Sequence, residues 1–258
     1  APTLGGLMVG GLSWHWIFIA MGGYALVMAA VTAFGIPEPL KPEYRQPLRL
    51  CHLFANYRRI STDASFIGYT LTNAAIYGGL FAFLSGASFV LIDVLGVQPE
   101  HFGFYFAAIV VGYIAGNLGS IRLARYLGPD QILFYGLITA LAGGAVMALL
   151  AYQQVYSPWA VMIPQAIFMA GTGLVLPQCM AGALANFPTM AGSASALFGF
   201  IQMSAAAIAG AIVGALHNGT PLVMATVIAT CAGLAMIGYL LLVQRYPAKA
   251  FETGKASA

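Results

Sequence analysis

Seven apolar runs, each about the length needed to cross a bilayer, constrain this chain more than any other feature. The runs cover residues 16–34, 66–86, 102–121, 131–152, 159–180, 191–216 and 222–243. None of them alternates apolar and polar residues with the period of two that a membrane β-strand requires. Helices are the other structure that satisfies backbone polar groups inside a bilayer. The sequence therefore predicts an all-α, polytopic membrane protein with seven full transmembrane helices.

The composition excludes most other classes of protein. Charged residues make up 7% of the chain, whereas soluble domains have about a quarter. The three cysteines are widely spaced and form no C-x-x-C pair, so no disulfide framework or zinc site is expected. The sequence contains no H-E-x-x-H, no G-x-S-x-G and no paired carboxylates. We predict a protein that is not an enzyme, with no catalytic residues, no metal, no cofactor and no nucleic-acid partner.

The basic residues indicate the orientation in the membrane. When the helices are threaded alternately, all ten Lys and Arg residues fall on one side. They lie in the loop after the first run, in the loop that carries Arg122 and Arg125, and in the tail. The opposite side carries Asp93, Glu100 and His217 but no Lys or Arg. The positive-inside rule then predicts that the basic side and the C-terminus are cytoplasmic.

The long basic loop at residues 37–65 divides the chain. We predict that residues 1–36 end one half, 66–243 form a second half and 244–258 form a cytoplasmic tail. Within the loop, Leu50, Leu53, Phe54 and Tyr57 are spaced as one face of a helix. Because basic residues flank this face, we expect a helix resting on the cytoplasmic membrane surface. A role in binding a partner stays open.

The opening stretch is apolar but too short to cross a bilayer, and it lacks the basic region of a signal peptide. Its Ala1-Pro2-x-x-Gly5-Gly6, followed by Trp14-x-Trp16-Ile17-Phe18, resembles the end of the antiporter motif of the major facilitator superfamily. That motif lies in the fifth of twelve helices. We therefore expect the chain to begin late in the fifth helix of a longer protein, with a partial helix before the seven full ones.

Further stretches look like the Bcr/CflA subfamily of drug-resistance transporters. They are FLSGASFVL, GLVLPQCMAGALANFPTMAGSASALFGFIQM and the loop with Arg122 and Arg125. The subfamily usually has a proline near Gly86 or Ala87, which this chain lacks. The resemblance implies a major-facilitator-type fold and a proton-coupled antiporter of the bacterial inner membrane, monomeric when full length. It implies a small drug-like substrate and places the proton-coupling residues in the preceding half.

Small residues at helical spacing predict close helix contacts. Gly6 and Gly10 are four apart, and Ala206, Gly210 and Gly214 repeat that spacing in the sixth full span. Small residues four apart let helix backbones approach closely in lipid. We interpret the motif residues Pro2, Gly5, Gly6 and Gly10, with Gly210 and Gly214, as a seam that permits sliding between the halves. Packing alone is the simpler interpretation for each glycine taken singly.

Uncharged polar and aromatic residues are the candidates for contact with the substrate, because no charged residue lies deep in a span. Interhelical hydrogen bonding is the simpler role for each amide, particularly Asn117. The candidates are Asn73, Tyr77, Phe81, Tyr105, Tyr113, Gln165, Phe198 and Gln202. The absence of a buried counter-charge favours neutral or lipophilic cargo.

Other functions remain possible at this point. A major-facilitator exporter of a native metabolite, such as a sugar or an amino acid, is the main alternative. A seven-helix receptor is a remote one, since the chain has no proper start for a free-standing domain. A retinal protein needs a mid-helix lysine, and no Lys occurs between Lys41 and Lys249.

Overall fold

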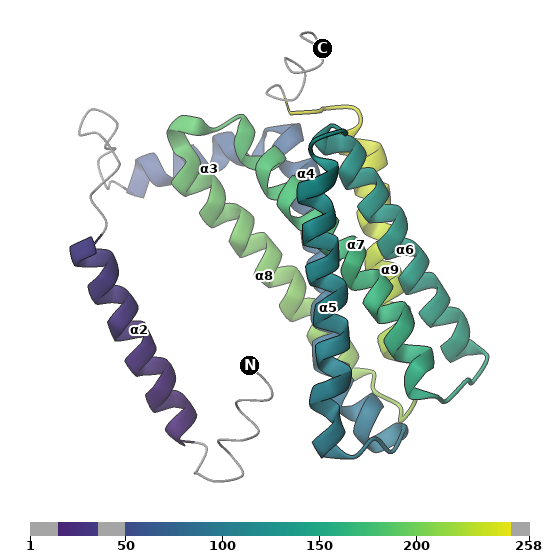
Figure 1. Ribbon diagram of the computed structural model, residues 1–258. Coiled ribbons are helices and arrows are strands. Elements are labelled where there is room, and N and C mark those ends of the chain that lie inside the picture. Colours follow the sequence, from purple (N-terminus) through teal and green to yellow (C-terminus); the bar gives the residue numbers. More distant parts are fainter. Residues whose placement is uncertain (1–14, 36–49, 249–258) are drawn as a thin grey trace. The chain divides into compact units, whose positions relative to one another are not determined.

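The structure is a computed structural model that describes residues 15–35 and 50–248 (Figure 1). The chain divides into two units, residues 1–48 and 49–258, and each is described by itself. The first unit contains α2 (His15–Gly35), which has no buried residue of its own. The motif residues Pro2, Gly5, Gly6 and Gly10 lie outside the described residues.

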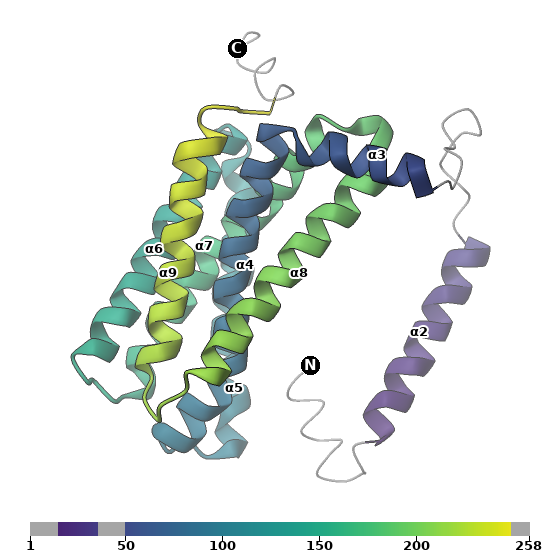
Figure 2. The ribbon, with the colours of Figure 1, turned by 180° about the vertical axis from the view of Figure 1, so that it is seen from behind.

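The second unit is a bundle of helices (Figures 1 and 2). In chain order they are α3 (Leu50–Ser61), α4 (Ala64–Ser88), η2 (Phe89–Val94), α5 (Pro99–Leu123), α6 (Pro129–Tyr152), α7 (Pro158–Ala185), η3 (Pro188–Met190), α8 (Ala191–Ala215), α9 (Leu222–Gly238) and η4 (Tyr239–Val243). Both η2 and η4 are π-helical and continue the helix before them. Within the described residues, seven helical segments are long and apolar enough to cross a membrane, which confirms the predicted spans.

Local sequence signals explain where these helices begin. The Asp63 carboxylate accepts a hydrogen bond of 2.8 Å from the backbone N–H of Phe66 and so caps α4. Pro129 and Pro158 occupy the first turns of α6 and α7, where the missing N–H costs nothing. The side chain of Gln131 accepts a hydrogen bond from the N–H of Gly128 and closes the start of α6.

The second membrane span extends well beyond the predicted end at Gly86. In the structure α4 continues to Ser88 and then through the π-helical turns of η2, so the span covers Ala64–Val94. Asp93 lies beyond the span end that the sequence predicted and so was expected in the connecting loop, but this was wrong, because it belongs to the last turn of η2. The physical reason is that no proline interrupts the helix here, and small residues such as Gly86 do not end it.

α7 is the central helix of the second unit, with α5 and α6 packed against it. Glycines allow these contacts. A Cβ atom at Gly112 would lie 2.5 Å from the carbonyl oxygen of Ala166, and one at Gly116 would overlap the carbonyl of Ala170. A Cβ atom at Gly143 would lie 2.6 Å from the backbone nitrogen of Phe168. The three helices thus meet backbone to backbone.

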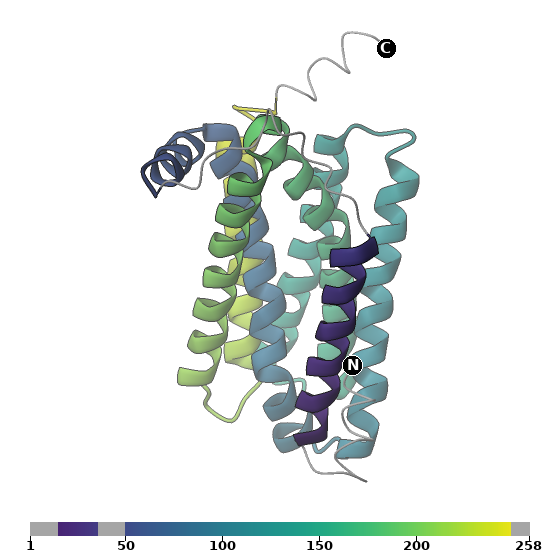
Figure 3. The same ribbon diagram turned by 90° about the vertical axis from the view of Figure 1, so that its left-hand side faces the viewer.

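On the other side of the second unit, α4 is flanked by α8 and α9 (Figure 2). Figure 3 shows α8 and α5 at opposite sides of this unit. α9 also packs against α6, which closes the bundle. Large side chains of α4 and α7, including Phe66, Tyr69, Phe83 and Phe168, are fully buried between the helices.

The described basic residues gather at one end of the second unit. Arg58 and Arg59 lie in the last turn of α3, Arg122 in the last turn of α5, and Arg245 just after η4. Figure 1 shows α3, the α5–α6 connection and the end of α9 at this same end. The helix predicted from Leu50 to Tyr57 is present as α3, and its Phe54 side chain is exposed.

Candidate substrate-binding residues

The three candidate residues on α4 differ in how far they are buried. Asn73 is buried, and its Nδ2 atom has no hydrogen-bond partner. Tyr77 and Phe81 are half-buried one and two turns further along, with ring centroids 5.0 Å apart. Their spacing of four residues puts all three on one side of the helix. This side of α4 therefore carries an amide nitrogen without a partner and two aromatic rings.

The two tyrosine candidates on α5 have different neighbours. Tyr113 is half-buried, and its hydroxyl lies within electrostatic range of the Tyr77 hydroxyl. Tyr105, in contrast, packs edge-on against Trp159 with a centroid distance of 5.9 Å. The Asn117 amide donates a 3.1 Å hydrogen bond to the carbonyl of Tyr113, within α5 rather than between helices. The structure thus places the ring of Tyr105 against α7, while Tyr113 lies within electrostatic range of Tyr77 on α4.

α7 carries the most unusual polar residue of the described chain. Gln165 is fully buried, and neither its Oε1 nor its Nε2 atom has a hydrogen-bond partner. A buried amide without partners destabilises a fold by about 1–3 kcal/mol. Thr172, two turns further along, is also buried but donates a 2.9 Å hydrogen bond to the carbonyl of Phe168. Gln165 and Asn73 thus have side-chain atoms without a hydrogen-bond partner, whereas the Thr172 hydroxyl already has one.

The two candidates on α8 differ in burial. Phe198 is buried, whereas Gln202 is half-buried. A Cβ atom at Gly210 would lie 2.6 Å from Ser85 Oγ of α4, while one at Gly214 would meet nothing within 4 Å. The described contact of Gly210 is therefore with α4, inside the same unit. The sliding seam between halves stays a prediction.

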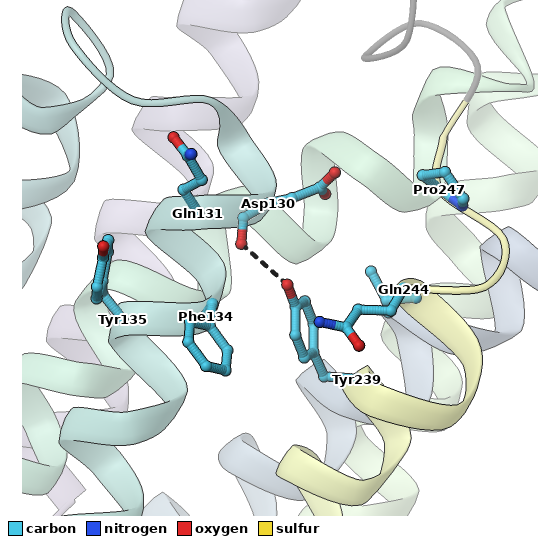
Figure 4. Close-up of a pocket in the computed structure, with 8 residues that line it drawn as sticks. Asp130, Gln131, Phe134, Tyr135, Tyr239, Gln244 and Pro247 are labelled. Carbon is cyan, nitrogen blue, oxygen red and sulfur yellow. Dashed lines mark hydrogen bonds between the residues drawn. The ribbon is translucent and has the colours of Figure 1, made fainter.

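A polar cluster that the sequence analysis did not single out joins three helices near the basic end. The Tyr69 hydroxyl of α4 donates a 2.7 Å hydrogen bond to Oδ1 of Asp130 in the first turn of α6. The Tyr239 hydroxyl donates to the Asp130 carbonyl at 3.4 Å (Figure 4). The ring of Tyr239 also stacks on Phe134 at a centroid distance of 5.7 Å. Asp130 thus ties the ends of α4, α6 and α9 together.

Asp130, Phe134, Tyr239 and Gln244 are among the residues that line a cavity of about 410 Å³ (Figure 4). An acidic residue in the first turn after Gly128-Pro129 is visible in the sequence as a helix start. Its partner Tyr69 lies 61 residues earlier, and no local pattern connects the two. This explains why the cluster was missed.

Comparison with known proteins identifies the family. The model of the Major Facilitator Superfamily matches residues 1–211. The chain belongs to this superfamily. The expected subfamily is also confirmed, because a bicyclomycin resistance protein homolog of Haemophilus influenzae is 30% identical over 95% of this chain.

Other members of the superfamily are similar. An uncharacterized MFS-type transporter of Bacillus subtilis, YdgK, is 31% identical over 83% of this chain. Multidrug resistance protein D of Escherichia coli is 24% identical over 78%. The chain covers 61%, 54% and 50% of these three relatives, so it spans about half of their length or slightly more. The family and these relatives are transporters, which points away from an enzyme.

Proposed function

We propose that the natural protein containing this chain exports neutral or lipophilic drug-like molecules from bacteria by alternating access. Its relatives include proteins named for drug resistance. The observation that carries the proposal is that two buried amides have polar atoms without hydrogen-bond partners, namely Nδ2 of Asn73 and both Oε1 and Nε2 of Gln165. Specific ligand sites combine mostly apolar walls with a few polar groups that fix the ligand's orientation.

We propose that the half-buried rings of Tyr77, Phe81 and Tyr113 supply the apolar wall. Flat rings stack on varied lipophilic molecules and demand little geometric precision. Phe198, Gln202 and Tyr105 are proposed as further contacts, with the ring of Tyr105 held by Trp159. A site built from such uncharged residues would favour uncharged cargo.

Proton exchange is part of the proposal, through groups outside this chain. The described carboxylates Asp63, Asp93 and Asp130 lie at helix ends rather than in the middle of a span. Carboxylates that relay protons through transporters generally lie inside the bundle. We therefore assign no coupling role to these three residues.

We propose that the basic end of the bundle faces the cytoplasm of a bacterial inner membrane. Arg58, Arg122 and Arg245 at that end support this orientation. In a background without native cysteines, Gln153→Cys should react with an impermeant thiol reagent added to intact cells. Tyr126 is exposed at the basic end. Tyr126→Cys should therefore react only after permeabilisation. The reverse pattern would overturn the orientation.

Replacement of Gln165 by leucine tests the substrate site. Gln165→Leu removes an unpaired amide and keeps its volume, so the folded protein should be as stable as the natural one or more stable. Drug accumulation in cells that express the variant should nevertheless rise toward that of cells without the transporter. Asn73→Leu should behave in the same way.

Gln178→Leu is the matched control on the same helix. Gln178 Nε2 donates a 2.9 Å hydrogen bond to Ser120 Oγ, so this change should lower stability by about 1–3 kcal/mol. If both Gln165→Leu and Asn73→Leu export drug at the rate of the natural protein, the proposed site is contradicted. If their export falls only as far as their stability falls, the two amides serve folding rather than substrate binding.

A further inference from the structure

An apolar groove of about 740 Å³ runs along the outside of the second unit, between α8 and α9 and over α4. Figure 2 shows α4 between these two helices. Small residues form much of the wall, among them Ala75 and Gly78 of α4 and Ala205 and Ala209 of α8. Leu234 of α9 lines the groove and is itself exposed. The groove is therefore open on the outside of this unit.

The groove offers no free hydroxyl group to a ligand. Thr226 and Thr230 are the hydroxyl residues in its wall. Thr226 donates to the carbonyl of Val223 at 2.9 Å, and Thr230 donates to the carbonyl of Thr226 at 2.7 Å. Both hydroxyls donate inside α9, so apart from these two groups and the Cys231 thiol the surface presented by the groove is hydrocarbon.

The groove lies at the depth of the bilayer interior. Its lining on α9 and η4 runs from Thr226 to Leu242, within the span Leu222–Val243. At the rise of a helix this is about 24 Å, most of the hydrocarbon thickness of about 30 Å. Spread over this length, a volume of about 740 Å³ makes the groove narrow. A flexible hydrocarbon chain fits the groove better than another helix does.

Arg245 gives the groove a charged end. It is exposed and follows Leu242, which lines the groove, by three residues. A basic residue at the cytoplasmic surface attracts anionic lipid headgroups. We propose that the groove between α4, α8 and α9 holds an acyl chain of an anionic phospholipid whose phosphate is bound by Arg245. The choice of leaflet follows from the orientation proposed above.

The test is photo-crosslinking in liposomes, with phosphatidylglycerol that carries a diazirine in one acyl chain. The natural protein should be labelled on α9 between Thr226 and Leu242 and on the facing part of α4. Thr230→Phe fills the groove and should remove most of this label. Val146→Phe, at an exposed position of α6 outside the groove, should leave the label unchanged.

The headgroup contact is tested separately with a surface residue that does not affect folding. Unlabelled phosphatidylglycerol should compete better than phosphatidylethanolamine. Arg245→Gln should weaken the competition by phosphatidylglycerol about fivefold. Arg122→Gln, at the same end of the bundle, should not. Equal competition by both lipids would overturn the role of Arg245.

Two other results would overturn the groove itself. Equal labelling of all lipid-exposed helices, unaffected by Thr230→Phe, would mean that the lipids form an ordinary annulus. Disulfide-linked dimers of a Thr230→Cys variant in membranes would mean that a second copy covers the groove. Neither result would bear on drug export, which is measured through Gln165.

Discussion

Two faces of the same bundle use small residues in opposite ways. Between α5 and α7, the backbone of one helix covers the glycines of the other, so that Gly112 and Gly116 face Ala166 and Ala170. Between α8 and α9, small residues such as Gly78 and Ala205 line an open groove. Their type and spacing alone do not distinguish these faces. What differs is whether the neighbouring helix runs close enough to fill the space.

The closed face has a physical reason to be tight. Lipid is as apolar as leucine, so helices in a bilayer are held by close packing and by hydrogen bonds rather than by the hydrophobic effect. Glycines bring the backbones of α5 and α7 together, and the hydrogen bond from Gln178 to Ser120 adds a polar link. This face should therefore be rigid, and substitutions in it should be the most damaging.

The largest effect is expected for Gly116→Ala. The new methyl group would overlap the carbonyl of Ala170, and backbone cannot move aside as a side chain can. We expect a loss of about 3 kcal/mol in the free energy of unfolding, measured by denaturation in detergent micelles. Gly119→Ala is the control, since its methyl group would lie 3.7 Å from Leu174 Cδ2 in ordinary contact. Equal stability of the two variants would show that the face is not closed.

A smaller effect is expected for Gly210→Leu at the contact of α8 with α4. A Cβ atom here would meet only the side chain of Ser85, with Oγ at 2.6 Å and Cβ at 3.7 Å, and the hydroxyl can rotate away. We expect a loss of about 2 kcal/mol, largely recovered in the double variant with Ser85→Gly because the two residues are in contact. If Gly210 also belongs to the sliding seam, the double variant should regain stability but not export. Recovery of both would limit Gly210 to packing on α4.

Tyr69→Phe should have a smaller effect again. The change keeps the buried ring and removes the hydrogen bond to Asp130, whose carboxylate is only partly buried. The expected loss is about 1 kcal/mol, measured in the same way. Tyr246→Phe, at an exposed tyrosine near the same end, should change stability by less than this. If Tyr69→Phe lowers the free energy of unfolding no more than Tyr246→Phe does, the hydrogen bond to Asp130 does not hold the helices together.

The spans could be predicted from the sequence because a bilayer imposes one length and one composition on each helix. Features that depend on which helices meet could not. The tie between Tyr69 and Asp130 and the contact of Gly116 with Ala170 join residues far apart in the chain. Asp93 shows a different limit, because a charged residue near a span end marks a boundary in the sequence although the helix continues through it.

The candidate site shows the same limit. The spacing of Asn73, Tyr77 and Phe81 on one helix was predictable. That the ring of Tyr105 packs against Trp159 was not, because the rotation of α5 about its axis is set by its packing on α7. The unpaired state of Gln165 is likewise a property of its neighbours.

The smallest effect expected is a gain. Gly233 lies within α9, and a Cβ atom there would meet nothing within 4 Å. Alanine should therefore fit without displacing any atom, and it removes the greater backbone freedom that glycine has in the unfolded chain. We expect Gly233→Ala to stabilise the protein by about 0.5 kcal/mol, seen as a higher midpoint in the denaturation that tests Gly116→Ala. If alanine lowers the free energy of unfolding at Gly116 but raises it at Gly233, the first glycine lies on a covered helix face and the second on an open one. A destabilised Gly233→Ala would mean that a further segment or partner packs against α9 at this position.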